Sequence, residues 1–289
     1  PAVIVFTSGS TGRPKGAIIP HAALVRLALG CFANRPGPGD RIAQLASPGF
    51  DGAFIELWGA LLNGAELVCP SAALDRLEDF SNLLRDHQIT RSFISTGVFN
   101  LLADEAPQCL SSLSTVMVGG EAMSRPHADR MLATHANLSI VYVYGPTENG
   151  ALTTSWQVPP GRGAAESSAP IGTPLPGNLC FVLDVGGRLL PCGFAGELWV
   201  GGEGLALGYE GQPEVTAEKF RNFSPDRLGL PSGPSLRLYR TGDRARWRSD
   251  GSAIDYLGRL DAQVKLNGYR IEPGEIEATI LLAADIRKA

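Results

Sequence analysis

The chain has 289 residues, with 29 acidic side chains against 25 lysines and arginines, and its net charge of −4 offers no basic surface for nucleic acid. Its 44% hydrophobic and 19% charged residues are ordinary for a globular protein of one large or two medium domains. No apolar run approaches the roughly 20 residues of a membrane-spanning helix, so we expect no membrane partner. The five cysteines lack C-x-x-C spacing, which favours free thiols in a reducing compartment, the cytoplasm, over disulfides or a zinc site.

Residues 1–156 alternate short apolar runs with helical patterns, which predicts an α/β subdomain: a mostly parallel sheet covered by helices. Ligands of such folds bind at the carboxyl ends of the strands, where motif-like loops follow Phe6, Val118 and Tyr144. The expected strands are Val3–Phe6, Glu66–Cys69, Ser92–Ile94, Val116–Val118 and Ser139–Tyr144, and the expected helices are His21–Cys31, Asp51–Leu62, Leu77–His87, Val98–Leu102 and Pro126–Ala136.

After a flexible connector at 157–168, the hydrophobic period changes to two, which predicts a β-rich subdomain over 169–260. A polar, glycine-containing boundary begins at Asp261, and a new helix is expected after Pro273. The chain starts within a strand pattern, without methionine, and its last residues resemble a helix that is cut short. We therefore expect it to be an excerpt of a longer protein.

The first motif is a loop that follows the strand Val3–Phe6. Its hydroxyl donors are Thr7, Ser8, Ser10 and Thr11, and its glycines are Gly9, Gly12 and Gly16. Glycines let backbone N–H groups approach anionic oxygens, and Lys15 adds a positive charge, so the loop suits a polyphosphate. It is not a Walker loop, because Pro14 precedes Lys15 and Gly16 follows it. A glycine-rich surface turn is the alternative interpretation.

Two further motifs carry a tyrosine and carboxylates. In Tyr142–Glu148, an aromatic ring at a strand end can stack on a base, and the carboxylate of Glu148 can hold a divalent cation. In Tyr239–Asp243, the carboxylate offers two acceptor oxygens to the hydroxyls of a ribose. The alternatives are a Gly-Pro turn beside a packed tyrosine and an aspartate that satisfies its own turn.

Together with the blocks Gly196–Tyr209 and Gly258–Glu277, these motifs resemble the adenylate-forming (AMP-binding) superfamily, and in particular the adenylation domains of nonribosomal peptide synthetases. The resemblance implies ATP and Mg²⁺ as cofactors and the adenylation of an amino acid to aminoacyl-AMP and pyrophosphate. It further implies transfer to a phosphopantetheine thiol on a carrier domain. Carrier (thiolation) and condensation domains of the same synthetase are then the expected partners.

The resemblance also implies roles for single residues. Lys15, Thr147 and Glu148 are the expected catalytic residues, with Glu148 as the Mg²⁺ ligand, and Tyr144 lies against adenine. Asp261 is the hinge about which a small C-terminal α+β domain, begun by residues 261–289, rotates. The ATP-binding set is Thr7, Ser8, Gly9, Ser10, Thr11, Gly12, Lys15, Gly120, Glu121, Tyr144, Gly145, Thr147, Asp243 (on ribose) and Arg259. Tyr142 departs from the family, which usually has asparagine there.

In peptide synthetases the residue that matches Asp51 pairs with the α-ammonium of the amino acid, whose burial needs a carboxylate partner. Asp51 could equally cap the helix that follows it. Small residues at Gly97 and Gly119 are expected to leave room for a sizeable apolar or aromatic side chain. The implied substrate pocket is Asp51, Gly52, Ile55, Gly97, Met117, Gly119, Val143, Ala151 and Leu152.

Two rival functions stay open at this point. The first is a stand-alone acyl- or aryl-CoA ligase, although such enzymes usually lack the aspartate at position 51. The second is a non-catalytic module that binds nucleotide without turnover. The family's catalytic lysine belongs well past the hinge and Lys288 stands in a different context, so the excerpt alone is expected to adenylate poorly.

Overall fold

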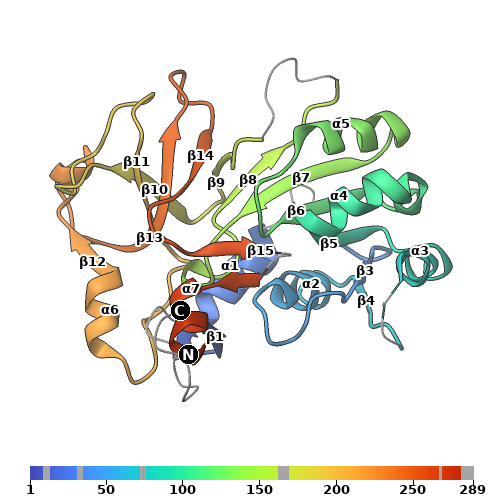
Figure 1. Ribbon diagram of the computed structural model, residues 1–289, viewed down its shortest axis with the longest axis horizontal. Coiled ribbons are helices and arrows are strands. Elements are labelled where there is room, and N and C mark those ends of the chain that lie inside the picture. The colour runs from blue at the N-terminus through green and yellow to red at the C-terminus, as the bar shows by residue number, and fades with distance from the viewer. Residues whose placement is uncertain are drawn as a thin grey trace.

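The computed structural model describes residues 1–8, 14–30, 35–71, 74, 76–161, 169–266 and 269–280. These residues form a seven-stranded sheet, a five-stranded sheet and two hairpin sheets, with helices packed around the largest sheet (Figure 1). The expected fold class, an α/β region followed by a β-rich one, is confirmed. Among the described helices, none is long and apolar enough to cross a bilayer.

The seven-stranded sheet has the order β4-β3-β5-β6-β7-β8-β9, and its first five strands run parallel. Its strands are β3 (Arg41–Ala43), β4 (Glu66–Val68), β5 (Arg91–Ser95), β6 (Thr115–Gly119), β7 (Ser139–Tyr144), β8 (Thr154–Gln157) and β9 (Thr173–Pro174). The two antiparallel strands β8 and β9 extend it beyond β7. Ligand-binding loops are thereby expected at the carboxyl ends of β6 and β7.

Helices cover both faces of this sheet (Figure 1). They are α1 (His21–Gly30), α2 (Gly52–Leu61), α3 (Leu77–Asp86), α4 (Thr96–Glu105) and α5 (Arg125–Thr134), with a 3₁₀ turn η1 (Pro107–Leu110) after α4. Side chains of β6 and β7 alternate between the faces, as a period of two requires. Val118 and Tyr144 pack in the cluster that holds α4 and α5, whereas Met117 and Val143 pack in the cluster that holds Ile55 of α2.

The first strand does not belong to the parallel sheet, which corrects the expectation for this segment. β1 (Val3–Thr7) pairs antiparallel with β2 (Lys15–Ile19) in a separate hairpin sheet. Ile4 and Phe6 are 41% and 65% exposed, so this strand is half-buried rather than fully buried. Its inner partner β2 is fixed instead to residues 207–210 by backbone hydrogen bonds, such as the one that Ile18 N donates to the carbonyl of Gly208.

The β-rich subdomain is built on β13 (Leu236–Trp247), which pairs with three other strands. These are β11 (Gly196–Gly202), β12 (Phe220–Phe223) and β14 (Ile254–Arg259), and β10 (Asn178–Leu183) pairs with β11 at the edge. Asp243 therefore lies inside a strand, next to a register shift, and not in a turn of its own, which was the alternative interpretation. The register places Asp243 directly opposite Arg259.

The remaining elements are short. The helix α6 (Pro213–Lys219) precedes β12, and 3₁₀ turns η2 (Thr147–Asn149) and η3 (Pro225–Leu228) follow β7 and β12. After position 261 come the hairpin of β15 (Val264–Leu266) and β16 (Tyr269–Ile271) and the helix α7 (Pro273–Ile280). Most of the connector expected at 157–168 lies outside the described residues, as does the end of the chain from 281.

Gly145 allows β7 and the segment after η2 to approach closely. A Cβ atom at this position would lie 2.4 Å from the carbonyl oxygen of Ala151 and 2.7 Å from the amide nitrogen of Thr153. Thr153 N also donates to the carbonyl of Tyr144 at 2.8 Å, so the backbones cannot simply separate. A side chain here is therefore excluded by backbone contacts rather than by movable side chains.

We predict that Gly145→Ala destabilises the fold by about 1–3 kcal/mol or more, because the added methyl group must displace a neighbouring backbone. Chemical denaturation of the variant and wild type measures this difference. Gly37→Ala is the control, since a Cβ there meets nothing within 4 Å. Equal stability of the Gly145→Ala variant and the wild type would contradict the close packing.

Glu56 of α2 is a buried acid that holds the segment after β3. Its carboxylate accepts hydrogen bonds from the amides of Leu45 and Ala46, each at 3.1 Å. Burial raises the pKa of Glu56 from 4.5 to about 8, and the two backbone hydrogen bonds only partly oppose this. Between these two values the folded state binds a proton that the unfolded state releases.

We therefore predict that Glu56 lowers stability progressively as the pH rises from about 5 to about 8. Glu56→Gln keeps the acceptor oxygen but does not titrate, so its free energy of unfolding falls less over this range than that of the wild type. Denaturant unfolding at a series of pH values gives both curves, and exposed Glu105→Gln is the control. Parallel curves for wild type and Glu56→Gln would show that the folded-state pKa is not raised.

Candidate active site

Three adjoining cavities lie at the carboxyl ends of β6 and β7, and Gly120 and Gly145 line all of them. The central cavity, about 490 Å³, is bordered by Thr7, Ser8, Pro14, Asp51, Tyr144, Thr147, Asp243 and Arg259, among others. The tyrosine cavity, about 390 Å³, is bordered by Glu121, Tyr142, Tyr144, Tyr256 and Arg259. The apolar cavity, about 220 Å³, is bordered by Phe50, Asp51, Gly52, Ile55, Phe93, Gly119, Val143, Ala151 and Leu152. Because they share walls, the cavities form one continuous site.

The side chains around the central cavity come from three different sheets. Thr7 belongs to the hairpin sheet, Tyr144 to the parallel sheet and Asp243 to the β-rich sheet. The expectation that motif loops meet at the rim of one sheet is therefore wrong in its topology. The tertiary packing of three sheets nevertheless brings these predicted residues to one cavity.

Asp243 is a buried carboxylate with a donor on each oxygen. The hydroxyl of Tyr144 donates to Oδ2 at 2.5 Å, and Nη1 of Arg259 donates to Oδ1 at 2.9 Å. Its own backbone amide donates to Oγ1 of Thr241 at 3.0 Å and not to the carboxylate. The carboxylate thus faces the cavity rather than satisfying its own turn, and a ligand hydroxyl there would exchange with these donors.

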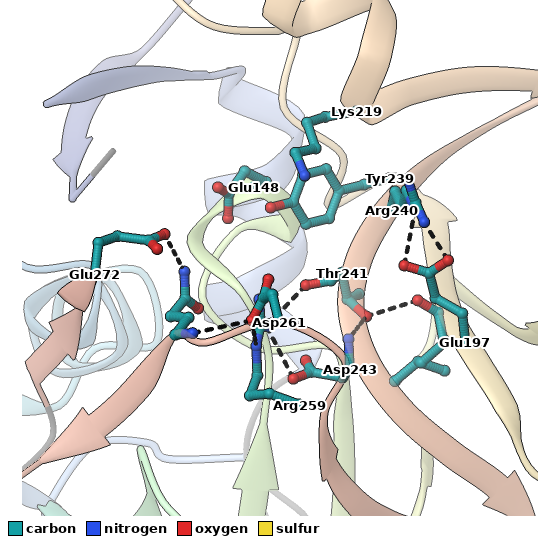
Figure 2. A network of polar contacts seen from close by, with 12 residues as sticks. Glu148, Glu197, Lys219, Tyr239, Arg240, Thr241, Asp243, Arg259, Asp261 and Glu272 are labelled. Atoms are coloured by element: carbon teal, nitrogen blue, oxygen red, sulfur yellow. Dashed lines mark hydrogen bonds and ion pairs between the residues drawn. The ribbon is translucent and has the colours of Figure 1, made fainter. Parts of the chain in front are cut away.

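Arg259 joins the cavity to the expected hinge (Figure 2). Besides Asp243, its guanidinium contacts both carboxylate oxygens of Asp261, at 2.8 and 2.5 Å, in a bidentate pair. The chain of contacts continues from Asp261 to the backbone amide of Gln263, whose side chain donates to Glu272 at 2.5 Å. A polar path therefore runs from the wall of the cavity to the segment that follows the hinge.

The ionisation of this network follows from its geometry. Burial alone would lower the pKa of Arg259, but the ion pairs with Asp261 and Asp243 raise it. Burial would raise the pKa of Asp261, but the hydrogen bond and charge of Arg259 hold it below its usual value. Burial and the neighbouring Asp243 raise the pKa of Tyr144 well above its usual range. The tyrosine therefore stays a neutral donor, and the arginine stays charged.

Asp51 stands where the central and apolar cavities meet, since it lines both. Its Oδ2 accepts a hydrogen bond of 2.5 Å from Oγ1 of Thr147. Asp51 occupies the position before α2, but its side chain makes no capping hydrogen bond there. The carboxylate is thus directed to the junction between a polar and an apolar space, and the capping alternative loses its support.

The apolar cavity contains seven of the nine residues that were expected there. Gly97, on the first turn of α4, and Met117, fully buried in β6, are not among the described residues that line it. Phe93, which was not expected there, does line it. A Cβ at Gly52 would lie 3.0 Å from the Phe93 ring and one at Gly119 would lie 3.4 Å from it. The ring thus fills part of the room that these glycines leave.

Lys15 and Glu148 are both buried, at 7% and 0% exposure. Neither is among the described residues that line the central cavity, although Thr147 and Pro14 beside them do line it. Both contact the same side chain. The hydroxyl of Tyr209 donates to Oε1 of Glu148 at 2.7 Å, and the Lys15 ammonium lies 5.8 Å from the centre of the Tyr209 ring. Gly9, Ser10, Thr11 and Gly12 of the expected phosphate loop lie outside the described residues.

The carboxylate of Glu148 could bind Mg²⁺ only together with oxygen atoms of a bound ligand. Within the described ranges, no group of three or more His, Cys, Asp or Glu side chains gathers to hold a metal. Magnesium in nucleotide sites is usually bound by one or two carboxylates together with substrate phosphates and water. A single buried carboxylate, Glu148, next to a polar cavity is consistent with that kind of site.

Sequence reasoning missed several residues of this site. Phe93 could have been found from strand parity, since it pairs in register with Met117 and shares its face of the sheet. Tyr256 was not singled out in the sequence, and Tyr209 and Gln263 lay in the blocks Gly196–Tyr209 and Gly258–Glu277 without an assigned role. Tyr142, where the family usually has asparagine, donates to the carbonyl of Glu121 at 3.0 Å.

Comparisons with known proteins agree with this architecture. A family model described as AMP-binding enzyme matches residues 1–210. The chain is 40% identical over its full length to tyrocidine synthase 3 of Brevibacillus parabrevis and 40% identical over 99% of its length to bacitracin synthase 1 of Bacillus licheniformis. It spans only 4% and 5% of those proteins.

The chain superposes on NpsA-ThdA, an artificially fused adenylation–PCP di-domain from Klebsiella oxytoca, with a TM-score of 0.88 and 31% identity. The match covers all of this chain and 56% of that one. The chain therefore belongs to the family of AMP-binding enzymes, and its fold is that of the adenylation domains of nonribosomal peptide synthetases.

Proposed function

We propose that this chain adenylates an amino acid with ATP, giving aminoacyl-AMP and pyrophosphate. The observation that carries the proposal is the position of Asp51, a carboxylate at the junction of an apolar cavity and a polar cavity. An amino acid has the matching layout, with an apolar side chain and an ammonium group on the same carbon. Its carboxylate then faces the central cavity, where the nucleotide would lie.

The apolar cavity supports a small or medium apolar side chain as the substrate class. Ile55, Phe93 and Val143 form its walls, and the Phe93 ring limits its depth over Gly119. A buried ammonium loses its hydration and needs an opposite charge to recover that free energy. Asp51 is the described carboxylate on this cavity's wall, so it is assigned to the ammonium.

Different parts of the nucleotide are assigned to the tyrosine cavity and to the central cavity. Adenine is assigned to the tyrosine cavity, against Tyr144, and the ribose hydroxyls to Asp243, which already accepts two hydrogen bonds of the kind that a ribose donates. Thr147 and Ser8 supply hydroxyls beside the expected α-phosphate and polyphosphate.

The reaction then needs only alignment and charge stabilisation. An oxygen of the substrate carboxylate attacks the α-phosphorus, a new P–O bond forms, and the bond to the β-phosphate breaks to release pyrophosphate. Glu148 would hold Mg²⁺, which would supply positive charge to the phosphate oxygens. Thr147 ties the two substrates together, because its hydroxyl contacts Asp51 while it lines the nucleotide cavity.

The second half-reaction is proposed from the relatives. NpsA-ThdA joins an adenylation domain to a PCP domain, which supports a carrier (thiolation) domain, with its phosphopantetheine thiol, as the acceptor here. Condensation domains of the same synthetase are the other proposed partners. The four described cysteines are free thiols, which supports a reducing compartment such as the cytoplasm.

Asp51→Asn in the full-length protein is expected to lower amino-acid-dependent pyrophosphate exchange about 30-fold or more, because the substrate ammonium loses its charge partner. The assay compares each amino acid with the same acid lacking the amine. Asp86→Asn, an exposed acid at the end of α3, is the control. If the variant keeps the wild-type preference for the amine, the role of Asp51 is wrong. Wild-type exchange with amine-free acids alone would favour an acyl-CoA ligase.

Asp243→Ala is expected to weaken ATP binding about 10- to 100-fold, the loss typical of hydrogen bonds to a charged acceptor. Calorimetry on the full-length protein measures it, with exposed Asp226→Ala as the control. The same titration with 2′,3′-dideoxy-ATP should show little difference between variant and wild type. An equal loss for both nucleotides would mean that Asp243 does not act on the ribose.

A further inference from the structure

Tyr209 has no role in the site described so far, yet it connects two of its charged residues. Its hydroxyl donates to Glu148, and its ring lies under the ammonium of Lys15. These residues come from different elements, η2 and β2, and are 133 positions apart in sequence. A single side chain that touches both is in a position to set their relative placement.

The position of Tyr209 is itself fixed on several sides. Its backbone bridges to Ala17 of β2, two residues from Lys15, and its amide donates to Oγ1 of Thr216 at 2.9 Å. Its ring packs edge-on against Phe220, with centroids 5.7 Å apart, and is only 5% exposed. The hydroxyl also lies 3.4 Å from that of Tyr239. The hydroxyl therefore has little freedom to follow a moving carboxylate.

Glu148 is held to the same segment by its backbone. The amide of Ala206 donates to the carbonyl of Glu148 at 2.9 Å, and the hydroxyl of Tyr209 fixes its side chain. A fully buried carboxylate requires donors, since burial without them is costly. The hydrogen bond to Oε1 thus both stabilises the charge and fixes the rotation of the carboxylate group.

We propose that Tyr209 is a positioning residue that holds the Glu148 carboxylate and the Lys15 ammonium in place for a Mg²⁺–triphosphate. The proposal rests on the proposed function, which assigns these two residues to the metal and the phosphates. The hydroxyl of Tyr209 orients the Glu148 carboxylate, and the face of its ring positions the Lys15 ammonium. A misplaced carboxylate loses metal affinity, because a ligand's orientation depends on its hydrogen-bond partners.

The test is ATP binding by calorimetry in the full-length protein, with Mg²⁺ and with EDTA. For Tyr209→Phe, which keeps the ring and removes the hydroxyl, we expect affinity to fall about tenfold with Mg²⁺ and to stay unchanged in EDTA. For Tyr209→Leu, which also removes the ring face, affinity in EDTA should fall as well, through Lys15. Tyr239→Phe is the matched control, since it keeps the bond from Tyr209 to Glu148.

A double variant separates positioning from a general structural effect. If Tyr209 acts through Glu148, Tyr209→Phe should cause no further loss of Mg²⁺-dependent affinity when Glu148→Gln is already present. Equal losses with Mg²⁺ and with EDTA, or an additive double variant, would overturn the proposal. Should Tyr209→Phe fail to fold, 3-fluorotyrosine at position 209 keeps the size and strengthens the donor. This substitution is expected to change the ATP affinity measured with Mg²⁺ and to leave the affinity measured in EDTA unchanged. An unchanged affinity with Mg²⁺ would count against the proposal. Wild-type protein that binds no ATP would overturn the proposed function, and this inference with it.

Discussion

The alternation of side chains along β7 is the constraint on which the rest of the site depends. Val143 points to the face covered by α1 and α2, and Tyr144, the next residue, points to the face covered by α4 and α5. Val143 lines both of these cavities, whereas Ile55 of α2 lines only the apolar cavity and Tyr142 only the tyrosine cavity. Gly145, which has no side chain, lies at the end of the strand and lines all three cavities, so that the apolar and tyrosine cavities both adjoin the central cavity. A shift of the register by one residue would exchange the two surfaces.

The charged residues add a second level of organisation. Asp243, Arg259 and Asp261 form one continuous set of contacts from the cavity wall to the expected hinge. These contacts connect the central cavity to the segment after 261. A ligand hydroxyl that donated to Asp243 would compete with Arg259 for the carboxylate.

Much of the fold followed from local pattern, and the exceptions have physical causes. β7 was expected at Ser139–Tyr144 and is observed there, because its apolar residues are buried on both faces. β2 was missed, since Lys15 and Gly16 resemble a loop and only the packing against residues 207–210 makes them a strand. β13 was missed because its charged residues form pairs across the sheet, such as Arg240 with Glu197. In the site, motif residues were identified by resemblance, but the contacts of Phe93 and Tyr209 depend on tertiary packing.

The central claim is that one continuous site holds both an amino acid and a nucleotide. The most direct measurement is a crystal structure of the full-length protein with a non-hydrolysable aminoacyl-adenylate analogue. The account predicts the α-ammonium within hydrogen-bond distance of Asp51, the ribose hydroxyls on Asp243 and the adenine against Tyr144. An analogue whose amine lies away from Asp51, or whose nucleoside occupies a different cavity, would contradict it.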